Sequence, residues 1–342
     1  MDISKINAAF LQLVDRKPTD FELQENLNNK RTFNLSNLYK RISSCDEFKN
    51  KVWKYQFFSY AATFDPIQLI LKFYQPDLEP IQNHLVNFLG VGFPHASLPL
   101  QNPTDIEELP IPANWHTDLA ELGGALHVVS ECSREFTMIE LGSGIGIWSN
   151  ICGKAAKMRG LKTRVIGIEA DKKHLKVAAE TLNVNKFLPD EYQLIHGIVA
   201  HTSGRALFKK HPDSGIDWGR QPILSSQAEL FAKALLSGDY DEVPVYNLDL
   251  LLNKISAVDL LHVDIQGGEE TLFDGQEVLL NDKIKNMIIG THSRSIEGKL
   301  FEFFQKLGWT LKAERPLVGA IREGNFVTVV DGVQYWKNNS LV

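Results

Sequence analysis

The spacing of apolar positions divides this chain into three regions. Residues 1–60 carry apolar side chains at helical intervals, which predicts a helical extension of short helices. Residues 61–117 are rich in proline and keep no regular period, as expected of a connecting or cap segment lying over a core. Residues 118–342 alternate short apolar runs with amphipathic stretches, which predicts an α/β domain whose parallel sheet is covered on both faces.

Within the third region the pattern predicts a regular succession of strands and helices. The predicted strands are 136–141, 164–170, 192–199, 258–265 and 286–291, followed by 308–314 and 325–331 as a pair that closes the sheet. The predicted helices are 118–133, 146–159, 171–182, 226–237, 266–280 and 295–307. A long excursion, 200–245, contains a polar loop around Trp218, and loops of this length in compact domains are commonly binding loops or lids.

The most informative stretch is the end of the strand 136–141. Glu140 and Leu141 are followed by Gly142, Gly144 and Gly146, and a helical pattern then begins. Glycine is needed where a backbone turns sharply and lets a ligand approach. A dinucleotide turn has the form G-x-G-x-x-G, but Ile147 occupies its third glycine position. The turn instead resembles the E-x-G-x-G-x-G turn of S-adenosylmethionine (SAM) dependent methyltransferases.

An acid at the end of the next strand supports a nucleotide-type ligand. Glu169 ends the strand 164–170, and a carboxylate at this place can accept both hydroxyls of a ribose. The interpretation as a solvated strand-end acid is less favoured because the glycine turn lies upstream.

Further polar residues lie at the carboxyl ends of the predicted strands, where open α/β sheets bind their ligands. They are Glu140, Ser143, Glu169, Asp171, His196, Asp264, Gln266, Thr291, His292 and Ser293. Asp264 could hold an amino group, ligate a divalent metal or take a proton from a hydroxyl. His292 is either a second base, since free imidazole has a pKa near 6.5, or a hydrogen-bonded structural histidine.

Other polar residues near this edge have ordinary structural explanations. Glu269 and Glu270 lie in the first turn of a helix, where carboxylates favour the helix dipole. His262 lies in the middle of a strand and is expected in the core. Trp115 and His116 precede a helix beside the site, and they either line the pocket or form a buried Trp with a surface His.

Composition and charge narrow the class of protein. The 342 residues are 44% hydrophobic and 23% charged, as in ordinary globular proteins, and suffice for one core domain with an appendage. The net charge of −6 predicts no general attraction to nucleic acid or anionic membrane. No apolar run approaches the ~20 residues of a membrane span, and no signal peptide is evident. Three dispersed cysteines suit a reducing cytoplasm.

With these residues identified, roughly 136–315 resembles the FkbM family of SAM-dependent methyltransferases. The resemblance rests on five segments: Glu140–Gly146, Ile168–Asp171, Asn183–Asn185, Leu248–Leu252 and Val263–Glu269. The last matches the family pattern D-x-E-G-x-E, with Gln266 in place of the first Glu. The family's next strand commonly ends in a Glu-x-His type pattern. This sequence keeps only the histidine of that pattern, His292.

The resemblance implies a Rossmann-like class I methyltransferase sheet and methyl transfer from SAM to a hydroxyl of a small molecule or sugar. The implied cofactor contacts are Glu140, Gly142, Ser143, Gly144, Glu169, Ala170 and Asp264. Asp264 and His292 are the catalytic candidates, and Gln266, Trp218 and His292 are candidates for acceptor binding. A divalent metal at Asp264 fits the residue type, but the sequence shows no full ligand set, so no metal is predicted.

Two other functions remain open at this point. A nicotinamide-dependent oxidoreductase would use a similar sheet, although Ile147 argues against it. A non-catalytic SAM-binding scaffold would use the N-terminal helices to dock partners or further copies of the chain. The intact glycine turn and Asp264 favour the enzyme.

Overall fold

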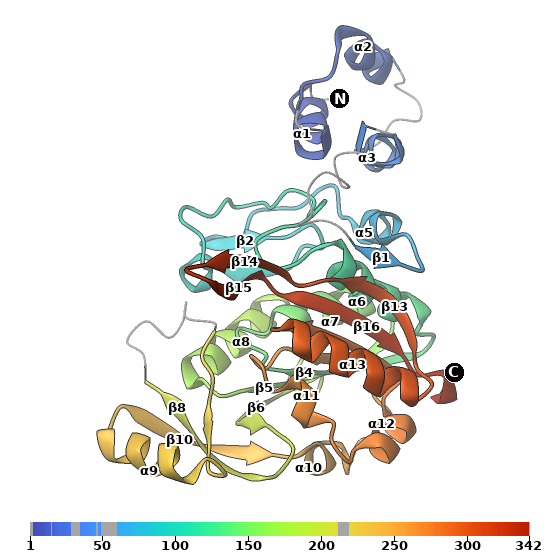
Figure 1. Ribbon diagram of the computed structural model, residues 1–342. Helices are drawn as coiled ribbons and strands as arrows, with labels where there is room; N and C mark the ends of the chain where they lie inside the picture. Colours follow the sequence, from blue (N-terminus) through green and yellow to red (C-terminus); the bar gives the residue numbers. More distant parts are fainter. Residues whose placement is uncertain are drawn as a thin grey trace.

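The computed structural model describes residues 3–14, 16–28, 35–45, 47–48, 60–210 and 219–341. Its centre is an eight-stranded sheet (Figure 1). In spatial order the strands are β1 (Ala61–Ala62), β13 (Thr310–Arg315), β16 (Gly332–Lys337), β12 (Asn286–Thr291), β11 (Leu260–Val263), β4 (Glu135–Leu141), β5 (Lys162–Glu169) and β6 (Tyr192–His196). The five strands from β12 to β6 are parallel, whereas β16 runs antiparallel to both of its neighbours.

Helices cover both faces of this sheet. Successive side chains of β4 show the two layers, because Met138 belongs to one hydrophobic cluster and Ile139 to the other. The first cluster includes residues of α5 (Pro66–Phe73), α6 (Leu119–Glu131), α7 (Ile147–Met158) and α8 (Lys172–Val184). The second includes residues of α10 (Leu248–Leu252), α11 (Glu269–Leu272), α12 (Glu277–Lys283) and α13 (Arg294–Lys306). The predicted Rossmann-like α/β sheet is confirmed.

The excursion after β6 forms a second, smaller sheet in place of the predicted long loop. Its order is β7 (Ile198–Val199), β10 (Tyr240–Tyr246), β8 (Gly204–Lys209) and β9 (Ile223–Leu224), with α9 (Ala228–Ser237) beside it. The predicted single strand 192–199 is therefore wrong, since β7 pairs with β10. At the break, a Cβ on Gly197 would lie 2.4 Å from the Tyr246 ring, so the chain can pass β10 only with glycine.

Of the two C-terminal strands predicted to close the sheet, 308–314 is confirmed as a strand of that sheet and 325–331 is not. β13 joins the main sheet, but β15 (Asn325–Val330) pairs with β14 (Val318–Arg322) in a separate hairpin, and β16 closes the sheet. Both β15 and β16 are apolar in sequence. They differ in burial, because Phe326 of β15 is 56% exposed while Trp336 of β16 is fully buried.

The helix predicted over 266–280 is interrupted. It is two short helices, α11 and α12, separated by residues 273–276. Gly275 between them has a φ of +69°, a left-handed conformation that ends a helix.

The region 61–117 holds more regular structure than its prolines predict. It contributes β1, α5, the hairpin of β2 (His84–Val86) with β3 (Gly92–Pro94), and a 3₁₀ turn η2 (His95–Ser97). Pro66 begins α5 behind the N-cap Asp65, a position where proline favours a helix.

The three predicted N-terminal helices are present as α1 (Ile3–Val14), α2 (Asp20–Asn28) and α3 (Leu35–Ser44), at the top of Figure 1. Phe10 and Leu38 share the hydrophobic cluster of α5, and Gln12 donates to the carbonyl of Leu109. The extension thus packs on the core. No helix in the described part of the chain is long and apolar enough to cross a membrane.

Candidate active site

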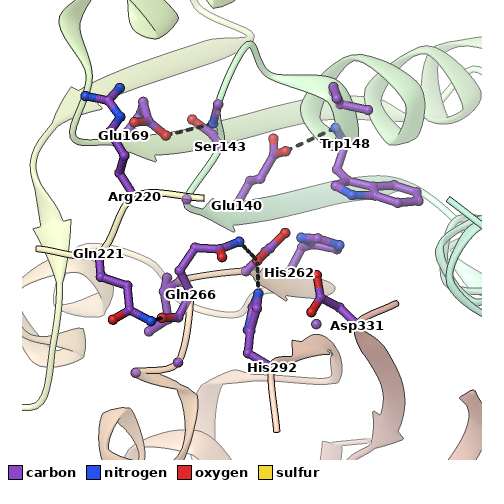
Figure 2. Close-up of a pocket in the computed structure, with 18 of the residues that line it drawn as sticks. Glu140, Ser143, Trp148, Glu169, Arg220, Gln221, His262, Gln266, His292 and Asp331 are labelled. Carbon is purple, nitrogen blue, oxygen red and sulfur yellow. Dashed lines mark hydrogen bonds and ion pairs between the residues drawn. The ribbon is translucent and has the colours of Figure 1, made fainter. Parts of the chain in front are cut away.

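A cavity of about 1040 Å³ opens at the carboxyl ends of β4, β5, β11 and β12. The described residues that the sequence analysis named as cofactor-binding, catalytic or acceptor-binding candidates all line it, namely Glu140, Gly142, Ser143, Gly144, Glu169, Ala170, Asp264, Gln266 and His292. Figure 2 shows Glu140, Ser143, Glu169, Gln266 and His292 among them. Trp218, the remaining candidate, lies outside the described residues. The volume is at the upper end of the range for small-molecule sites, which leaves room for two ligands side by side.

The glycine turn has the conformation that its sequence predicts. Gly142, Gly144 and Gly146 have φ angles of +75°, +50° and +76°. A Cβ on Gly142 would lie 1.9 Å from the carbonyl oxygen of Asp264, so the turn requires glycine for space as well as for φ. The hydroxyl of Ser143 is buried against the cavity and has no hydrogen-bond partner among the described residues.

Glu140 is only 2% exposed, and its bonds anchor the helix that follows the turn. It accepts the backbone N–H groups of Trp148 (3.1 Å) and Ser149 (2.8 Å) and the Ser149 hydroxyl (2.5 Å). Burial raises the pKa of this carboxyl. The structure therefore gives Glu140 a structural task at the N-terminus of α7 that the sequence analysis did not anticipate.

Glu169 lies at the end of β5 beside the turn. One carboxylate oxygen accepts the N–H of Gly144 and the other accepts the N–H of Asp171, both at 2.8 Å. Each oxygen keeps a second lone pair, so the carboxylate can still accept hydroxyl groups from a ligand. The backbone of the turn thereby orients the predicted ribose partner.

Residues 220 and 221 cross from one end of the cavity to the other. The Arg220 guanidinium lies 4.5 Å above the Phe208 ring and pairs with Asp171. Gln221 donates to the carbonyl of Gln266 across the cavity (2.7 Å). The small inserted sheet is thus attached to both β5 and β11.

Asp264 follows β11 and stands at the opposite end from Glu169. Its Oδ1 lies 3.2 Å from Nε2 of His292 and accepts the side-chain amide of Gln266, also at 3.2 Å (Figure 2). Burial alone would raise the pKa of Asp264, but its bonds with His292 and Gln266 and the charge of His262 outweigh burial and lower it. The side chain remains 46% exposed at the cavity wall.

His292 lies between two carboxylates. Its Nδ1 is 2.8 Å from Glu269, opposite the contact of Nε2 with Asp264. Burial would lower its pKa, but the two carboxylates raise it to about 10. The free imidazole pKa used in the sequence analysis therefore does not describe this ring.

Glu269 is the main site residue that sequence reasoning missed. The helix dipole was its expected role, yet the side chain is fully buried and accepts the N–H groups of Ile265 (3.3 Å) and Gly267 (3.1 Å) besides contacting His292. A signal was present, since the acid follows Asp264 by five residues across a glycine pair.

Potential ligand atoms of Asp264, Glu269 and His292 lie within 4.8 Å of one another. They could hold a metal ion only if one ring nitrogen pointed between both carboxylates. Here each nitrogen of His292 lies beside a different carboxylate, which is an ion-paired arrangement in which Nδ1 makes no well-aligned hydrogen bond with the described residues.

The inner wall of the cavity carries a second polar group. His262 stacks on Trp148 with 4.9 Å between ring centroids, and its Nε2 lies 3.0 Å from Glu121. It is buried as expected, but it also lines the cavity, opposite Glu140 in the register of β11 and β4.

His116 lines the cavity too, and burial lowers its pKa to about 3. At the far side Arg315 pairs with Asp118, the N-cap of α6.

Comparison with known proteins gives a consistent match. Residues 140–316 match the family of the methyltransferase FkbM domain. A protein of Jannaschia sp. (strain CCS1) named "Putative methyltransferase" is 38% identical over 260 residues, covering 75% of this chain and 93% of its own length.

Among solved structures, methyltransferase FkbM from Methylobacillus flagellatus KT is 14% identical with a TM-score of 0.38. That alignment covers 64% of this chain and only 54% of the other. M. capricolum TrmK in complex with S-adenosylhomocysteine is 11% identical with a TM-score of 0.33, over 63% of this chain and 67% of its own.

Proposed function

This chain belongs to the FkbM methyltransferase family, and from this premise we propose that it transfers a methyl group from SAM to a hydroxyl oxygen of a small molecule or sugar. The observation that carries the proposal is one cavity with two unlike ends. One end presents a glycine turn and Glu169, and the other presents Asp264 and His292.

The cofactor end fits SAM in its residue types. Gly142, Ser143, Gly144, Glu169 and Ala170 would hold the cofactor. The buried Ser143 hydroxyl has no partner among the described residues, so a ligand that fills this end could supply one. The carboxylate of Glu169 is held in place by backbone N–H groups, which favours binding of ribose hydroxyls.

The acceptor end fits a hydroxyl group. When bound, SAM supplies a methyl on a sulfonium: the acceptor oxygen forms the C–O bond as the C–S bond breaks, the electron pair stays on sulfur, and the hydroxyl proton must leave. Asp264 can accept a hydrogen bond from that hydroxyl and align its oxygen, and alignment accounts for much of the rate of such displacements. The aromatic and carboxylate side chains of Trp148, Trp115 and Glu121 favour an acceptor with several hydroxyl groups.

Titration calorimetry with SAM, S-adenosylhomocysteine and NADH tests the cofactor. We expect micromolar binding of the two sulfur nucleosides and none of NADH. Binding of NADH instead would show an oxidoreductase.

Transfer of label from [methyl-³H]SAM to a panel of sugars and small alcohols tests the reaction. Labelled ether products are expected, and the label should be released from them only under conditions that cleave ethers. SAM binding without transfer to any hydroxyl acceptor would favour the non-catalytic scaffold.

A further inference from the structure

We propose that Glu269 is a positioning residue, which holds His292 as an imidazolium between two carboxylates so that Asp264 keeps one oxygen free for the acceptor hydroxyl. In this arrangement the acceptor proton leaves through Asp264, and His292 is not the base. The inference rests on the proposed function and assigns a role inside the same site.

Among Asp264, Glu269 and His292, Glu269 is the most deeply buried side chain. Its side chain is fully buried, and Oε1 faces two backbone N–H groups as well as Nδ1 of His292 at 2.8 Å. Oε2 is buried without a partner among the described residues. A buried carboxylate is costly unless a positive charge compensates it, and among the described residues His292 is the cationic partner in contact with Glu269.

His292 transmits this restraint to Asp264. Because Nδ1 faces one carboxylate and Nε2 faces another, both nitrogens act as N–H donors in the imidazolium form. Neither nitrogen then offers a lone pair to a hydroxyl proton. A flip of the ring about the Cβ–Cγ bond would put Cδ2 and Cε1 in place of the two nitrogens, so both carboxylates favour the orientation seen here.

Asp264 is left with one occupied and one open oxygen. Oδ1 receives His292 and the amide of Gln266, each at 3.2 Å, whereas Oδ2 has no hydrogen-bond partner among the described residues. Gln266 is itself held in a left-handed conformation, φ +59°, with its carbonyl bound to Gln221. The side chain lines the cavity, so Oδ2 is the atom available to an acceptor.

The lowered pKa of Asp264 makes it a weak base toward a neutral hydroxyl. As the C–O bond forms, however, the oxygen becomes positively charged and strongly acidic, and its proton then passes to Oδ2 and on to water. His262 and Glu121 from the inner wall and Asp331 and Arg315 from the C-terminal segments add to the charges acting on this group.

Nuclear magnetic resonance of the full-length protein with ¹⁵N-labelled histidine tests the proposal without any acceptor. The His292→Gln variant assigns the signals of His292. We expect both ring nitrogens protonated at pH 8 in the wild type. In Glu269→Gln, which keeps an oxygen for the two backbone donors, His292 should titrate about 1 to 3 pH units lower.

Glu270→Gln is the matched control, since it removes the same charge one residue away from an exposed pair with Lys299. It should leave the His292 signals unchanged. A neutral His292 at pH 8 in the wild type overturns the proposal. Equal behaviour of Glu269→Gln and Glu270→Gln would overturn it as well.

Two further readouts separate this inference from the proposed function. Calorimetry with S-adenosylhomocysteine should give affinities within about threefold for wild type and Glu269→Gln, while kcat falls at least about tenfold with unchanged KM for SAM. Glu269→Asp, which keeps the charge, should restore part of kcat. Absence of nucleoside binding in the wild type refutes the proposed function but leaves the His292 measurement standing.

A metal titration tests the remaining alternative, which is that Asp264, Glu269 and His292 bind a metal ion. Calorimetry of the wild type with Mn²⁺ should show no stoichiometric binding at micromolar concentration. One equivalent of Mn²⁺ bound in the wild type and lost in Glu269→Gln would replace the positioning role with a metal site.

Discussion

The two ends of the cavity are built by different means. At the cofactor end, the carboxylate of Glu169 is held by backbone N–H groups, and the glycine turn supplies one of them. At the acceptor end, backbone N–H groups hold Glu269, but His292 lies between the side chains of Asp264 and Glu269, and the three residues come from three separate elements. The first construction depends on backbone conformation, whereas the second depends on how side chains meet. We therefore expect substitutions at the cofactor end to change binding and those at the acceptor end to change turnover.

The largest effect is expected at the acceptor end. Asp264→Asn keeps the size of the side chain but cannot take the acceptor proton, so kcat should fall about 10²- to 10⁴-fold. The affinity for S-adenosylhomocysteine should change far less. Asp274→Asn, in the exposed loop between α11 and α12, is the control for labelled methyl transfer. Similar rates for the two variants would remove Asp264 from the chemistry.

Gly142→Ala tests the close approach of the glycine turn, at the cofactor end, to the backbone of Asp264, at the acceptor end. The new Cβ would overlap the carbonyl oxygen of Asp264 and strain a φ of +75°, and we expect a loss of about 3 kcal/mol or more in unfolding free energy. Gly160→Ala is matched in φ (+71°) but has no atom within 4 Å, so it should lose only about 1–2 kcal/mol. Urea denaturation measures both. Equal losses would mean that the contact with Asp264 is not tight.

Glu169→Ala isolates the cofactor end. Hydrogen bonds to a charged group contribute about 1.5–3 kcal/mol, so SAM should bind about 10- to 100-fold more weakly. At saturating SAM kcat should be nearly unchanged, the opposite of the result for Asp264→Asn. Glu180→Ala, on the exposed face of α8, is the calorimetric control. A fall in kcat without loss of affinity would contradict the division between the two ends.

The smallest effect is expected at Arg220, which covers the cofactor end from the inserted sheet. Its guanidinium stacks on Phe208, a kind of contact that contributes about 0.5–1 kcal/mol, and it pairs with the largely buried Asp171; neither contact is made with the ligand itself. Arg220→Ala should weaken S-adenosylhomocysteine binding about two- to fivefold. Arg205→Ala, which breaks an exposed pair with Glu242 in the same sheet, should have no effect.

The cofactor end and the acceptor end also differ in how much of each could be predicted from the sequence. The strand 286–291 and the glycine turn were predicted correctly because local rules decide them: an apolar run bounded by polar residues, and a φ that only glycine adopts easily. The ribose candidate Glu169 needed only its place at a strand end. The C-terminal hairpin was missed because β15 and β16 carry the same apolar pattern, and only packing assigns one of them to the core.

The acceptor end could be predicted only as a list of residues. Asp264 and His292 were named from their strand ends, but nothing local shows that Glu269 faces the other side of the same imidazole. That contact raises the pKa of His292, which favours the structural alternative over the second base. His262 was expected only in the core, since its position opposite Glu140 depends on the pairing of β11 with β4.

The adjacent residues Arg220 and Gln221 have a consequence for the binding of the two ligands. One pairs with Asp171 beside the cofactor end, and the other binds the carbonyl of Gln266 beside the acceptor end. A ligand that displaces either contact changes the free energy of the other, and this coupling acts equally in both directions. Each ligand's affinity should therefore depend on whether the other is bound, and the factor should be the same for both ligands.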